Sequence, residues 1–372
     1  MKIVVASDSF KGSMSSVDVA QAAEQGIRMV QPDCEVVAVN VADGGEGTVE
    51  AIVDALGGEI VKVNVSDPLG REIVACYGLA GETAIIEMAA ASGLPLLKPE
   101  ERNPWLTSTY GTGEMIMDAI SRGCRNFLVG IGGSATNDAG TGMLQAMGFR
   151  FYDAQGLLIE DCCGGRMHDI VCVDDSQVPD SVRQSVFTVA CDVDTPFCGP
   201  EGAAPVFAPQ KGADAEMVSR LDSGMASLAK VIADKYAVDV VPVAGAGAAG
   251  GMGGAFYAFL HAKLKKGIDM VLDAIDFDAT IKGANLVITG EGKVDFQTAK
   301  GKTAAGVLSR AKKQHIPVIA IGGCVEMCDS LLQMGFAGIY PILEEKVPLE
   351  VAMQRDFAMS NVTKTVAKVL SR

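Results

Sequence analysis

Residues 285–290 have the sequence NLVITG, a short run of apolar and β-branched side chains that predicts a buried β-strand. Similar runs occur near both ends of the chain, at KIVVAS (2–7), EVVAVNV (35–41), PVIAIGG (317–323) and GIYPIL (338–343). Helical patterns separate or follow these runs, at 16–30, 302–313, 325–334 and 348–370. Strands that alternate with helices in this way predict a parallel sheet with helices on both faces.

The two ends of the chain are therefore expected to fold together. Five strands suit a flavodoxin-like (Rossmann-like) α/β domain made of residues 1–61 and 283–372. Residues 62–282 then form an inserted second domain of mixed α/β character, in which runs such as NFLVGIGG (126–133) predict further strands. A chain of 372 residues is long enough for two hydrophobic cores of ordinary size.

The composition limits the class of protein. No run of eighteen or more uncharged apolar residues occurs, and the start of the chain turns polar too early for a signal peptide, so we expect a cytoplasmic protein without a membrane segment. A formal net charge of −15 argues against nucleic acid or an anionic membrane as a partner. The 10 cysteines lack the spacing of a zinc site and are expected to be reduced.

Polar clusters follow three of the predicted strands, in SDSFKG (7–12), ADGGEGT (42–48) and TGEGKVDFQTAKGKT (289–303). The carboxyl ends of parallel strands meet at one edge of a sheet, where ligands bind, so we expect these clusters to form one site. The side chains in question are Asp8, Lys11, Asp43, Glu46, Glu291, Asp295 and Lys302. Taken singly, Asp8 and Asp43 fit the ordinary role of helix N-caps, but capping does not need Lys11 or Glu46.

The GKT sequence at 301–303 is not a Walker A loop. That motif needs a glycine five residues before Gly301, and this position holds Phe296. The stretch is therefore expected to serve phosphate chemistry as a strand-end loop of a different design.

Within the predicted insertion, GIGGSATNDAGTG (130–142) follows an apolar strand. Its glycines and hydroxyl groups predict a pocket of backbone amides for phosphate oxygens, although an ornate strand-to-helix turn is the alternative. The expected nucleotide-binding residues are Gly132, Gly133, Ser134, Thr136, Asn137 and Asp138. Further along, Asp192 and Asp194 are candidates for magnesium ligation or for a general base, and Lys211 is either a phosphate ligand or a solvated lysine.

GAGAAG (245–250) matches the glycine pattern of dinucleotide-binding loops, with Asp269 at about the required distance of roughly 20 residues. Pro242 interrupts the preceding strand, so close helix packing or a hinge explains the glycines as well. The 3 histidines lie in none of the polar clusters, which disfavours a Ser-His-Asp hydrolase. An inventory of carboxylates, lysines, hydroxyls and glycine turns suits phosphoryl transfer.

The motifs taken together resemble the type-1 family of bacterial glycerate kinases. They occur in the order of that family from residue 2 to about residue 325, as SDSFKGSMSS, VADGGEGTVEA, IEMAAASGL, GIGGSATNDAGTGM, ACDVDTP, PQKGA, GAGAAGGMGG and ITGEGKVDFQTAKGK. The resemblance implies transfer of the γ-phosphoryl group of ATP to a hydroxyl of D-glycerate with Mg²⁺, giving 2-phosphoglycerate in preference to 3-phosphoglycerate. It also implies an active site in the cleft between a flavodoxin-like domain and an inserted domain.

The resemblance further implies roles for individual residues. The implied catalytic set is Asp8, Lys11, Asp192, Glu291, Asp295 and Lys302. Asp192 and Glu291 are the expected metal ligands, and the 132–138 turn with Lys211 is the expected nucleotide side. Substrate contacts are expected from Asp43, Gly44, Glu46 and Arg71. Lys293 stands where the family commonly has arginine, and a lysine supplies the charge without the forked hydrogen bonding.

Two other functions are kept as alternatives. One is an NAD(P)-dependent oxidoreductase of a small hydroxy acid that uses residues 245–250, and the other is a non-catalytic sensor of sugar acids. The expected partners are small molecules, glycerate and ATP, with a homodimer left open.

Overall fold

The computed structural model describes residues 1–45, 47–343 and 347–371, which fold into two compact units. The first unit contains Met1–Leu56 and Ile268–Arg372, and the second contains Gly57–Gly267. Each end of the chain thus contributes to the first unit, and the middle of the chain forms the second.

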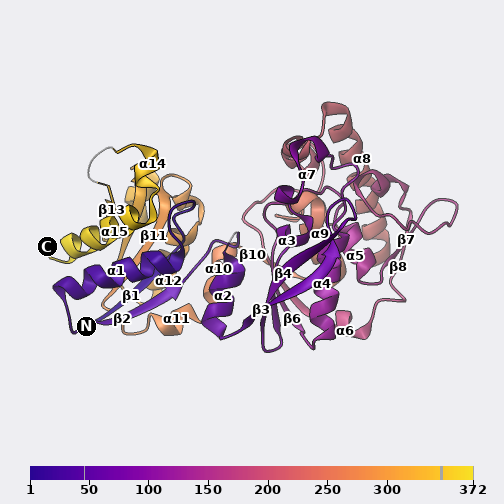
Figure 1. The fold of residues 1–372 in the computed structure, drawn as a ribbon. Helices are drawn as coiled ribbons and strands as arrows, with labels where there is room; N and C mark the ends of the chain where they lie inside the picture. Colours follow the sequence, from indigo (N-terminus) through magenta and orange to yellow (C-terminus); the bar gives the residue numbers. More distant parts are fainter. Residues whose placement is uncertain (46, 344–346, 372) are drawn as a thin grey trace. The chain divides into compact units, whose positions relative to one another are not determined.

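The first unit is built on a five-stranded sheet of order β13-β12-β11-β1-β2, in which every neighbouring pair is parallel. In Figure 1 the indigo strand β1 runs beside the orange strand β11, and Ile3 of β1 pairs with Leu286 of β11 although the two residues are far apart in the sequence. The strands are β1 (Lys2–Ser7), β2 (Glu35–Asn40), β11 (Leu286–Val294), β12 (Val318–Val325) and β13 (Gly338–Pro341).

 A second long-range contact lies at the start of β1, where Nζ of Lys2 donates a hydrogen bond of 2.7 Å to the carbonyl oxygen of Thr280, 278 residues further along the chain.

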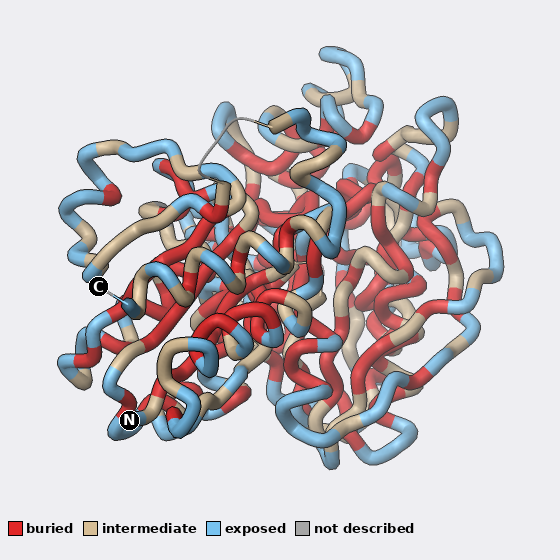
Figure 2. The backbone as a smooth tube through the Cα atoms, turned by 60° about the vertical axis from the view of Figure 1, so that its left-hand side comes forward, coloured by how far each residue is buried: buried red, intermediate tan, exposed pale blue. Residues whose placement is uncertain are grey.

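The three central strands of this sheet, β1, β11 and β12, form because most of their side chains are buried on both faces. Five of the six residues of β1 are buried, and β-branched side chains pack well on such a surface. Figure 2 shows the buried segments in red in the interior and the exposed segments in pale blue mostly at the outside. The chain runs from β1 to β2 on one side and later returns to β11 on the other side of β1, so the order of the strands reverses between β1 and β11.

Helices α1 and α15 pack against each other over this sheet. Gly26 of α1 permits the contact, because a Cβ atom there would lie 2.5 Å from the carbonyl oxygen of Thr363. The hydroxyl of Thr363 donates to the carbonyl oxygen of Ala22 at 2.9 Å. The helices of the unit are α1 (Ser16–Val30), α2 (Thr48–Leu56), α10 (Gly267–Ala274), α11 (Phe277–Thr280), α12 (Thr303–Lys313), α13 (Asp329–Met334), α14 (Leu349–Ala352) and α15 (Arg355–Leu370).

The division of the chain differs from the boundaries expected at 61/62 and 282/283. Residues 268–282 belong with the first unit, because Arg310 of α12 bonds the carboxylates of Asp273 and Asp278. At the other boundary, residues from Glu59 onward form a strand of the second sheet. Both differences have the same cause. Each of the two segments belongs to the unit in which its side chains or its backbone find bonding partners.

The second unit is built on a six-stranded mixed sheet of order β10-β9-β6-β5-β4-β3. The three strands at the β3 end pair antiparallel, and the pairs from β5 to β10 are parallel. The strands are β3 (Glu59–Ser66), β4 (Glu72–Ala80), β5 (Thr83–Glu87), β6 (Asn126–Gly130), β9 (Val186–Ala190) and β10 (Lys263–Lys265), with a separate pair β7 (Arg150–Tyr152) and β8 (Cys172–Asp174).

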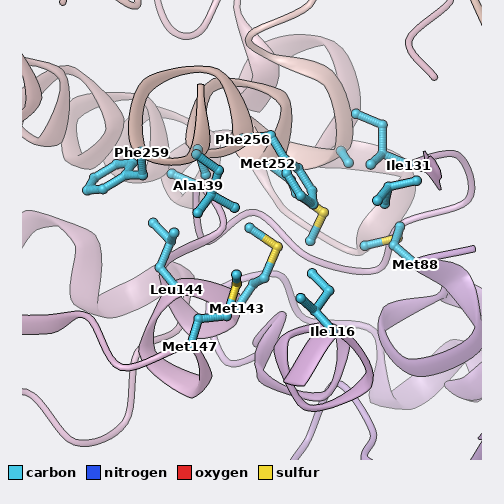
Figure 3. Packing of buried hydrophobic residues seen from close by; sticks show 14 of the residues in the cluster. Met88, Ile116, Ile131, Ala139, Met143, Leu144, Met147, Met252, Phe256 and Phe259 are labelled. Atoms are coloured by element: carbon cyan, nitrogen blue, oxygen red, sulfur yellow. The ribbon is translucent and has the colours of Figure 1, made fainter. Parts of the chain in front are cut away.

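A large apolar cluster forms the core of the second unit. Figure 3 shows part of it, in which Met252 and Phe256 of α9 lie in the same cluster as Met143 of α5. Within the described part of the chain, no helix is long and apolar enough to cross a membrane. The helices are α3 (Ala89–Ser92), α4 (Tyr110–Ser121), α5 (Thr141–Ala146), α6 (Asp180–Arg183), α7 (Ala203–Phe207), α8 (Ala215–Tyr236) and α9 (Ala248–Leu260).

Candidate active site

A pocket of about 780 Å³ lies at the carboxyl ends of the strands of the first unit. The segments that follow β1, β2 and β13 contribute to it, as do the last residues of β11 and β12. The charged side chains in its lining are the carboxyl groups of Asp8, Asp43 and Glu291 and the ammonium groups of Lys11, Lys293 and Lys302. The pocket therefore brings together side chains from all three predicted strand-end clusters.

Asp8 is buried directly after β1, with 5% of its surface exposed. Its Oδ1 accepts a hydrogen bond from the backbone N–H of Ser9 at 2.7 Å, and its Oδ2 accepts one from the hydroxyl of Thr303 at 2.9 Å. Burial raises the pKa of Asp8, and the nearby carboxylate of Asp43 raises it further, while the two hydrogen bonds act in the opposite direction. Asp8 is not the N-cap of α1, because Ser15 caps that helix.

Glu291 lies on β11 and is also buried, with 6% of its surface exposed. The hydroxyl of Thr298 donates a hydrogen bond to its Oε1. Burial raises the pKa of Glu291 to about 7, although the Thr298 hydroxyl and the charge of Lys302 favour the ionised form. A carboxyl group with a pKa close to neutrality can exchange protons or bind a cation at working pH.

Asp295 lies close to this pocket but not in its lining. Its Oδ1 accepts from the backbone N–H of Gln297 at 2.8 Å, and its Oδ2 lies 3.3 Å from Nζ of Lys293. Burial acts to raise the pKa of Asp295, but the Gln297 amide and Lys293 outweigh it and hold the pKa below its usual value. These contacts suit a residue that positions Lys293 and the turn after β11.

The second strand-end cluster contributes Asp43 to the pocket. Its Oδ1 accepts from the backbone N–H of Gly45 at 3.2 Å. Gly44 has a φ of 90°, a left-handed conformation that favours glycine and lets the chain turn sharply beside the carboxylate. Glu46, which was expected to contact the substrate, lies outside the described residues.

Two of the three lysines come from loops next to buried acids. Lys11 is exposed in the loop after β1, and Lys302 is half-buried directly before α12. Lys302 is the N-cap residue of α12, a helix of 11 residues whose N-terminal amides carry partial positive charge. Lysine side chains and a helix start thus face the same pocket, which suits an anion.

The turn at 130–142 in the second unit is mostly buried. Gly132 and Gly133 are exposed, whereas the side chains after them are covered. Asp138 is fully buried and accepts four hydrogen bonds, from N and Oγ1 of Thr109 and from the backbone amides of Gly140 and Gly142. Burial raises the pKa of Asp138 against these bonds. Its carboxylate organises the turn from inside the unit.

Lys211 is buried beneath the same turn, with 1% of its surface exposed. Its Nζ donates to Oγ of Ser134 and to the carbonyl oxygen of Thr136, both at 2.6 Å. Burial lowers the pKa of Lys211 to about 7, and the charge of Asp138 partly opposes that shift. Of the two expectations for Lys211, the solvated lysine is wrong because the side chain is enclosed.

Asp192 and Arg71 also lie in the second unit. Asp192 is exposed after β9, and its Oδ1 accepts from the backbone N–H of Gly267 at 2.9 Å. The guanidinium of Arg71 pairs with Asp67 at 2.6 Å and with Glu101 at 2.7 Å. The pairing of Arg71 favours a local structural role, and its contact with substrate stays a prediction.

The glycine motif at 245–250 packs against the 130–142 turn. A Cβ atom on Gly250 would lie 2.2 Å from the carbonyl oxygen of Thr136, and the backbone N–H of Ala139 donates to the carbonyl oxygen of Gly250 at 2.9 Å. Three successive residues, Ala249, Gly250 and Gly251, have positive φ values of 53°, 67° and 94°. The glycines therefore serve close packing inside the unit.

Two side chains that contact the candidate site were not predicted from the sequence. Thr298 and Thr303 are fully buried, and their hydroxyls hold Glu291 and Asp8. Both threonines occur in the 289–303 stretch, each at the start of a helical turn. A hydroxyl at a helix start is usually interpreted as a cap, so the sequence offered no signal for these bonds.

Carboxylates are the donors that a divalent cation would use. Among the described residues, no group of three or more His, Cys, Asp or Glu side chains is arranged to hold a metal ion by itself. A metal in the first unit would then need oxygen ligands from its substrate in addition to protein carboxylates, as is usual for magnesium.

The comparisons with known proteins agree with one another along the whole chain. The model of the "Glycerate kinase family" matches residues 3–372. A glycerate kinase of Bacillus cereus is 45% identical over 372 residues, covering 99% of this chain and 97% of the relative. A glycerate 2-kinase of Escherichia coli is 44% identical over 375 residues, covering 99% and 98%. A crystal structure described as a candidate glycerate kinase 2 from Salmonella typhimurium aligns with a TM-score of 0.91 at 45% identity, covering 100% of this chain and 97% of the other.

Proposed function

The chain belongs to the glycerate kinase family, and from that premise we propose that it transfers the γ-phosphoryl group of ATP to a hydroxyl of D-glycerate. The observation that carries the proposal is the pocket of the first unit, in which three carboxyl and three ammonium groups converge from separate strand ends. Phosphoryl transfer needs charge neutralisation and positioning more than covalent chemistry, and this lining supplies both. The oxidoreductase and sensor alternatives have no support from the relatives.

We infer that the first unit is flavodoxin-like. Numbered within the unit, its strands have the order 2-1-3-4-5, and in such sheets ligands bind beyond the carboxyl ends of the strands, where the strand order reverses. Asp8 follows β1 and Glu291 lies on β11, the two strands beside that reversal. The topology thus favours these two carboxyl groups as the centre of the chemistry.

The donor set fits the magnesium ion that the family resemblance implies. Mg²⁺ is usually held by one or two carboxylates together with substrate phosphates. Glu291 provides a buried carboxyl in the first unit, and Asp192 is proposed as the ligand from the second. When bound, the ion neutralises charge on the transferred phosphoryl group.

Lys11 and Lys302 are proposed to bind phosphate oxygens, and a carboxylate is proposed to take the proton. The hydroxyl oxygen of glycerate forms a bond to the γ-phosphorus, the bond from that phosphorus to the ADP oxygen breaks, and the hydroxyl proton passes to a carboxylate. Asp8 and Asp192 are the two candidates for that carboxylate. The proposed product is 2-phosphoglycerate, since the relative from Escherichia coli is named a glycerate 2-kinase.

The 132–138 turn of the second unit is proposed to bind phosphate oxygens of the nucleotide. Among the described residues, Oγ1 of Thr136 and Oδ1 of Asn137 are buried without a hydrogen-bond partner, which is unusual for a purely structural turn.

The role of the turn can be tested at Gly132. A Cβ atom on Gly132 would meet nothing within 4 Å, so Gly132→Ala and Gly132→Asp are both compatible with the fold. We expect the aspartate to raise the KM for ATP by about tenfold or more and the alanine to have little effect. Equal kinetics for both variants would remove the turn from the site.

The proposed function is tested by a coupled assay of ADP release with D-glycerate, ATP and magnesium, followed by phosphorus NMR of the product. Steady ADP release that depends on glycerate supports it, and the phosphorus spectrum distinguishes the 2-phosphate from the 3-phosphate. An enzyme that binds ATP but releases no ADP with any glycerate isomer would contradict it. The cytoplasmic location and a homodimer stay predictions from the sequence.

A further inference from the structure

The pocket of the first unit has a charged part and an apolar part. The carboxyl and ammonium groups come from the segments after β1 and β2, from β11 and from the residue before α12. The apolar lining comes from the ends of β12 and β13, from α14 and from the loop after β1. It includes Phe10, Val325, Pro341, Ile342 and Met353.

Glycerate leaves the apolar part of the pocket unexplained. Each of its three carbons carries oxygen, so it has almost no apolar surface to bury, and the charged part of the pocket suits it. A volume of about 780 Å³ is also in the range of pockets that hold much larger ligands. The second substrate of the proposed reaction is ATP, whose adenine base is large, flat and aromatic and can pack its two faces against apolar side chains.

We propose that the apolar part of this pocket, at the ends of β12 and β13, binds the adenosine end of ATP. The proposal rests on the proposed function for the identity of the nucleotide. It places the base in the first unit, next to the residues that handle the phosphates. A ligand with a charged triphosphate and a flat aromatic base matches a pocket that has a charged part and an apolar part.

The strand register supports a continuous path from one part to the other. Glu291 on β11 pairs with Gly322 on β12, and Lys293 pairs with Cys324. Neighbouring strands lie about 4.8 Å apart, so the end of β12 is roughly 10 Å from the end of β1, which is two strands away. A triphosphate chain spans such a distance between Asp8 and a base lodged beyond β12.

The backbone along this path is free of side chains at two positions. Gly292 and Gly323 both line the pocket. A Cβ atom on Gly323 would lie 2.8 Å from the carbonyl oxygen of Gly292, so the two strands approach closely there. Glycine at such positions lets the backbone come near a ligand.

Met353 belongs to the apolar part of the pocket and packs against the loop after β1, which carries Lys11. Its Cε lies 2.8 Å from the position of a Cβ atom on Gly12, the residue after Lys11. Methionine adapts its shape and packs well against aromatic rings. A base held under Met353 would therefore sit beside the loop that carries Lys11.

Cys324 offers a direct test, because this thiol is exposed and lines the apolar part. The experiment measures its alkylation by iodoacetamide in the intact protein, with and without ADP, by mass spectrometry of the peptides. Cys172, an exposed thiol of the second unit, is the internal control. At ADP about ten times its Kd we expect alkylation of Cys324 to slow about tenfold and that of Cys172 to stay unchanged.

Tripolyphosphate provides the matched ligand without a base. We expect it to leave Cys324 alkylation within about twofold of the free protein, since its charge belongs in the other part of the pocket. Equal protection by tripolyphosphate and ADP would overturn the proposal, because phosphates would then cover Cys324. Full reactivity of Cys324 under saturating ADP would overturn it as well.

A kinetic comparison gives an independent readout if the thiol reacts too slowly to measure. Met353→Glu places a charge in the apolar part, and Leu332→Glu places the same charge on an exposed leucine of α13 in the same unit. We expect Met353→Glu to raise the KM for ATP by about tenfold or more with an unchanged KM for glycerate, and Leu332→Glu to leave both unchanged. An unchanged KM for ATP in Met353→Glu would overturn the proposal.

The two proposals fail in different ways. Protection of Cys324 by ADP without any turnover would remove the glycerate kinase reaction and keep the adenosine site. Turnover of glycerate with an unprotected Cys324 would keep the reaction and place the base elsewhere.

Discussion

The hydroxyl of Thr303 donates a hydrogen bond of 2.9 Å to Oδ2 of Asp8, across 295 residues of sequence. This bond ties the start of α12 to the end of β1 and fixes the direction of a buried carboxylate. It is one of the contacts that turn separate strand ends into one pocket.

Replacement of Thr303 by valine removes that hydroxyl at nearly constant volume. A hydrogen bond to a charged group contributes about 1.5–3 kcal/mol, so we expect kcat/KM to fall by about tenfold to a hundredfold. Thr303→Ser keeps the hydroxyl and should stay close to the parent enzyme. The measurement is steady-state kinetics of both variants, and equal activity of the two would show that this bond does not orient a reacting group.

Glu291→Gln tests the buried carboxyl on β11. We expect turnover to fall by about 10²-fold to 10⁴-fold, the usual contribution of a positioned acid or base. Thermal stability should stay the same or rise, because burial disfavours the charged carboxylate and glutamine is neutral. Glu35→Gln at the amino end of β2 is the control, since Glu35 is exposed at the opposite edge of the sheet. Normal turnover in Glu291→Gln would remove Glu291 from the chemistry.

Lys211 makes stability depend on pH in a defined direction. Its pKa is lowered by burial to about 7, so between pH 7 and the ordinary value of 10.5 the unfolded chain holds a proton that the folded chain has released. The free energy of unfolding therefore rises with pH by at most about 1.4 kcal/mol for each pH unit in this window because of this group. This stability is lost as the pH falls from 10.5 to 7, and below pH 7 the contribution no longer changes, because both states hold the proton. Urea unfolding of the parent and of Lys211→Met between pH 7 and pH 9 measures the slope.

We expect a smaller slope in Lys211→Met than in the parent. Lys230→Met, which changes an exposed lysine of α8, should keep the slope of the parent. The slope is the readout, because loss of the bonds to Ser134 and Thr136 also changes the absolute stability. Identical slopes for all three proteins would mean that Lys211 stays protonated in the folded state.

Gly250→Ala distinguishes a packing glycine from one that serves a cofactor. The residue has a φ of 67° and its new Cβ would lie 2.2 Å from the carbonyl oxygen of Thr136. Gly156→Ala is the matched control, with a φ of 77° and open space around the Cβ. We expect the control to lose about 1 kcal/mol of stability for the backbone strain, and Gly250→Ala to lose more through the clash. Equal losses would show that the 245–250 segment shifts freely.

Asp192 has a proposed chemical role and an observed hydrogen bond, and two substitutions separate them. Asn at 192 keeps an acceptor for the amide of Gly267 but removes the charge, whereas Ala removes both. We expect both variants to lose about 10²-fold or more in turnover, and only the alanine variant to lose stability in urea. An active asparagine variant would limit Asp192 to holding the Gly267 amide.

Periodicity identified the elements that bury the most apolar surface. The pattern at 16–30 matches α1, and the runs at 2–7, 35–41, 285–290, 317–323 and 338–343 match the strands of the first sheet. Short elements such as β10 (Lys263–Lys265) were not predicted. Three residues are too few to show an alternation of apolar and polar side chains, and this strand forms by pairing with the edge of β9.

The candidate site divides in a similar way. The carboxylates and lysines after β1, β2 and β11 could be found from the sequence, because an acid or a lysine beside a glycine turn at a strand end is unusual. The buried state of Asp138 and Lys211 could not, since both lie in a glycine-rich turn that a sequence pattern presents as open to ligands.

The sequence by itself determined the alternation of strands and helices, the return of the chain to its first sheet and the family, because these depend on residue type and spacing along the chain. Only the tertiary structure decided which acids are buried, which hydroxyls donate hydrogen bonds to them, and that the pocket has an apolar part beside its charged part. The physical reason is that burial and hydrogen bonding are properties of pairs of segments, and Asp8 acquires its partner only when α12, 295 residues away at Thr303, packs beside β1.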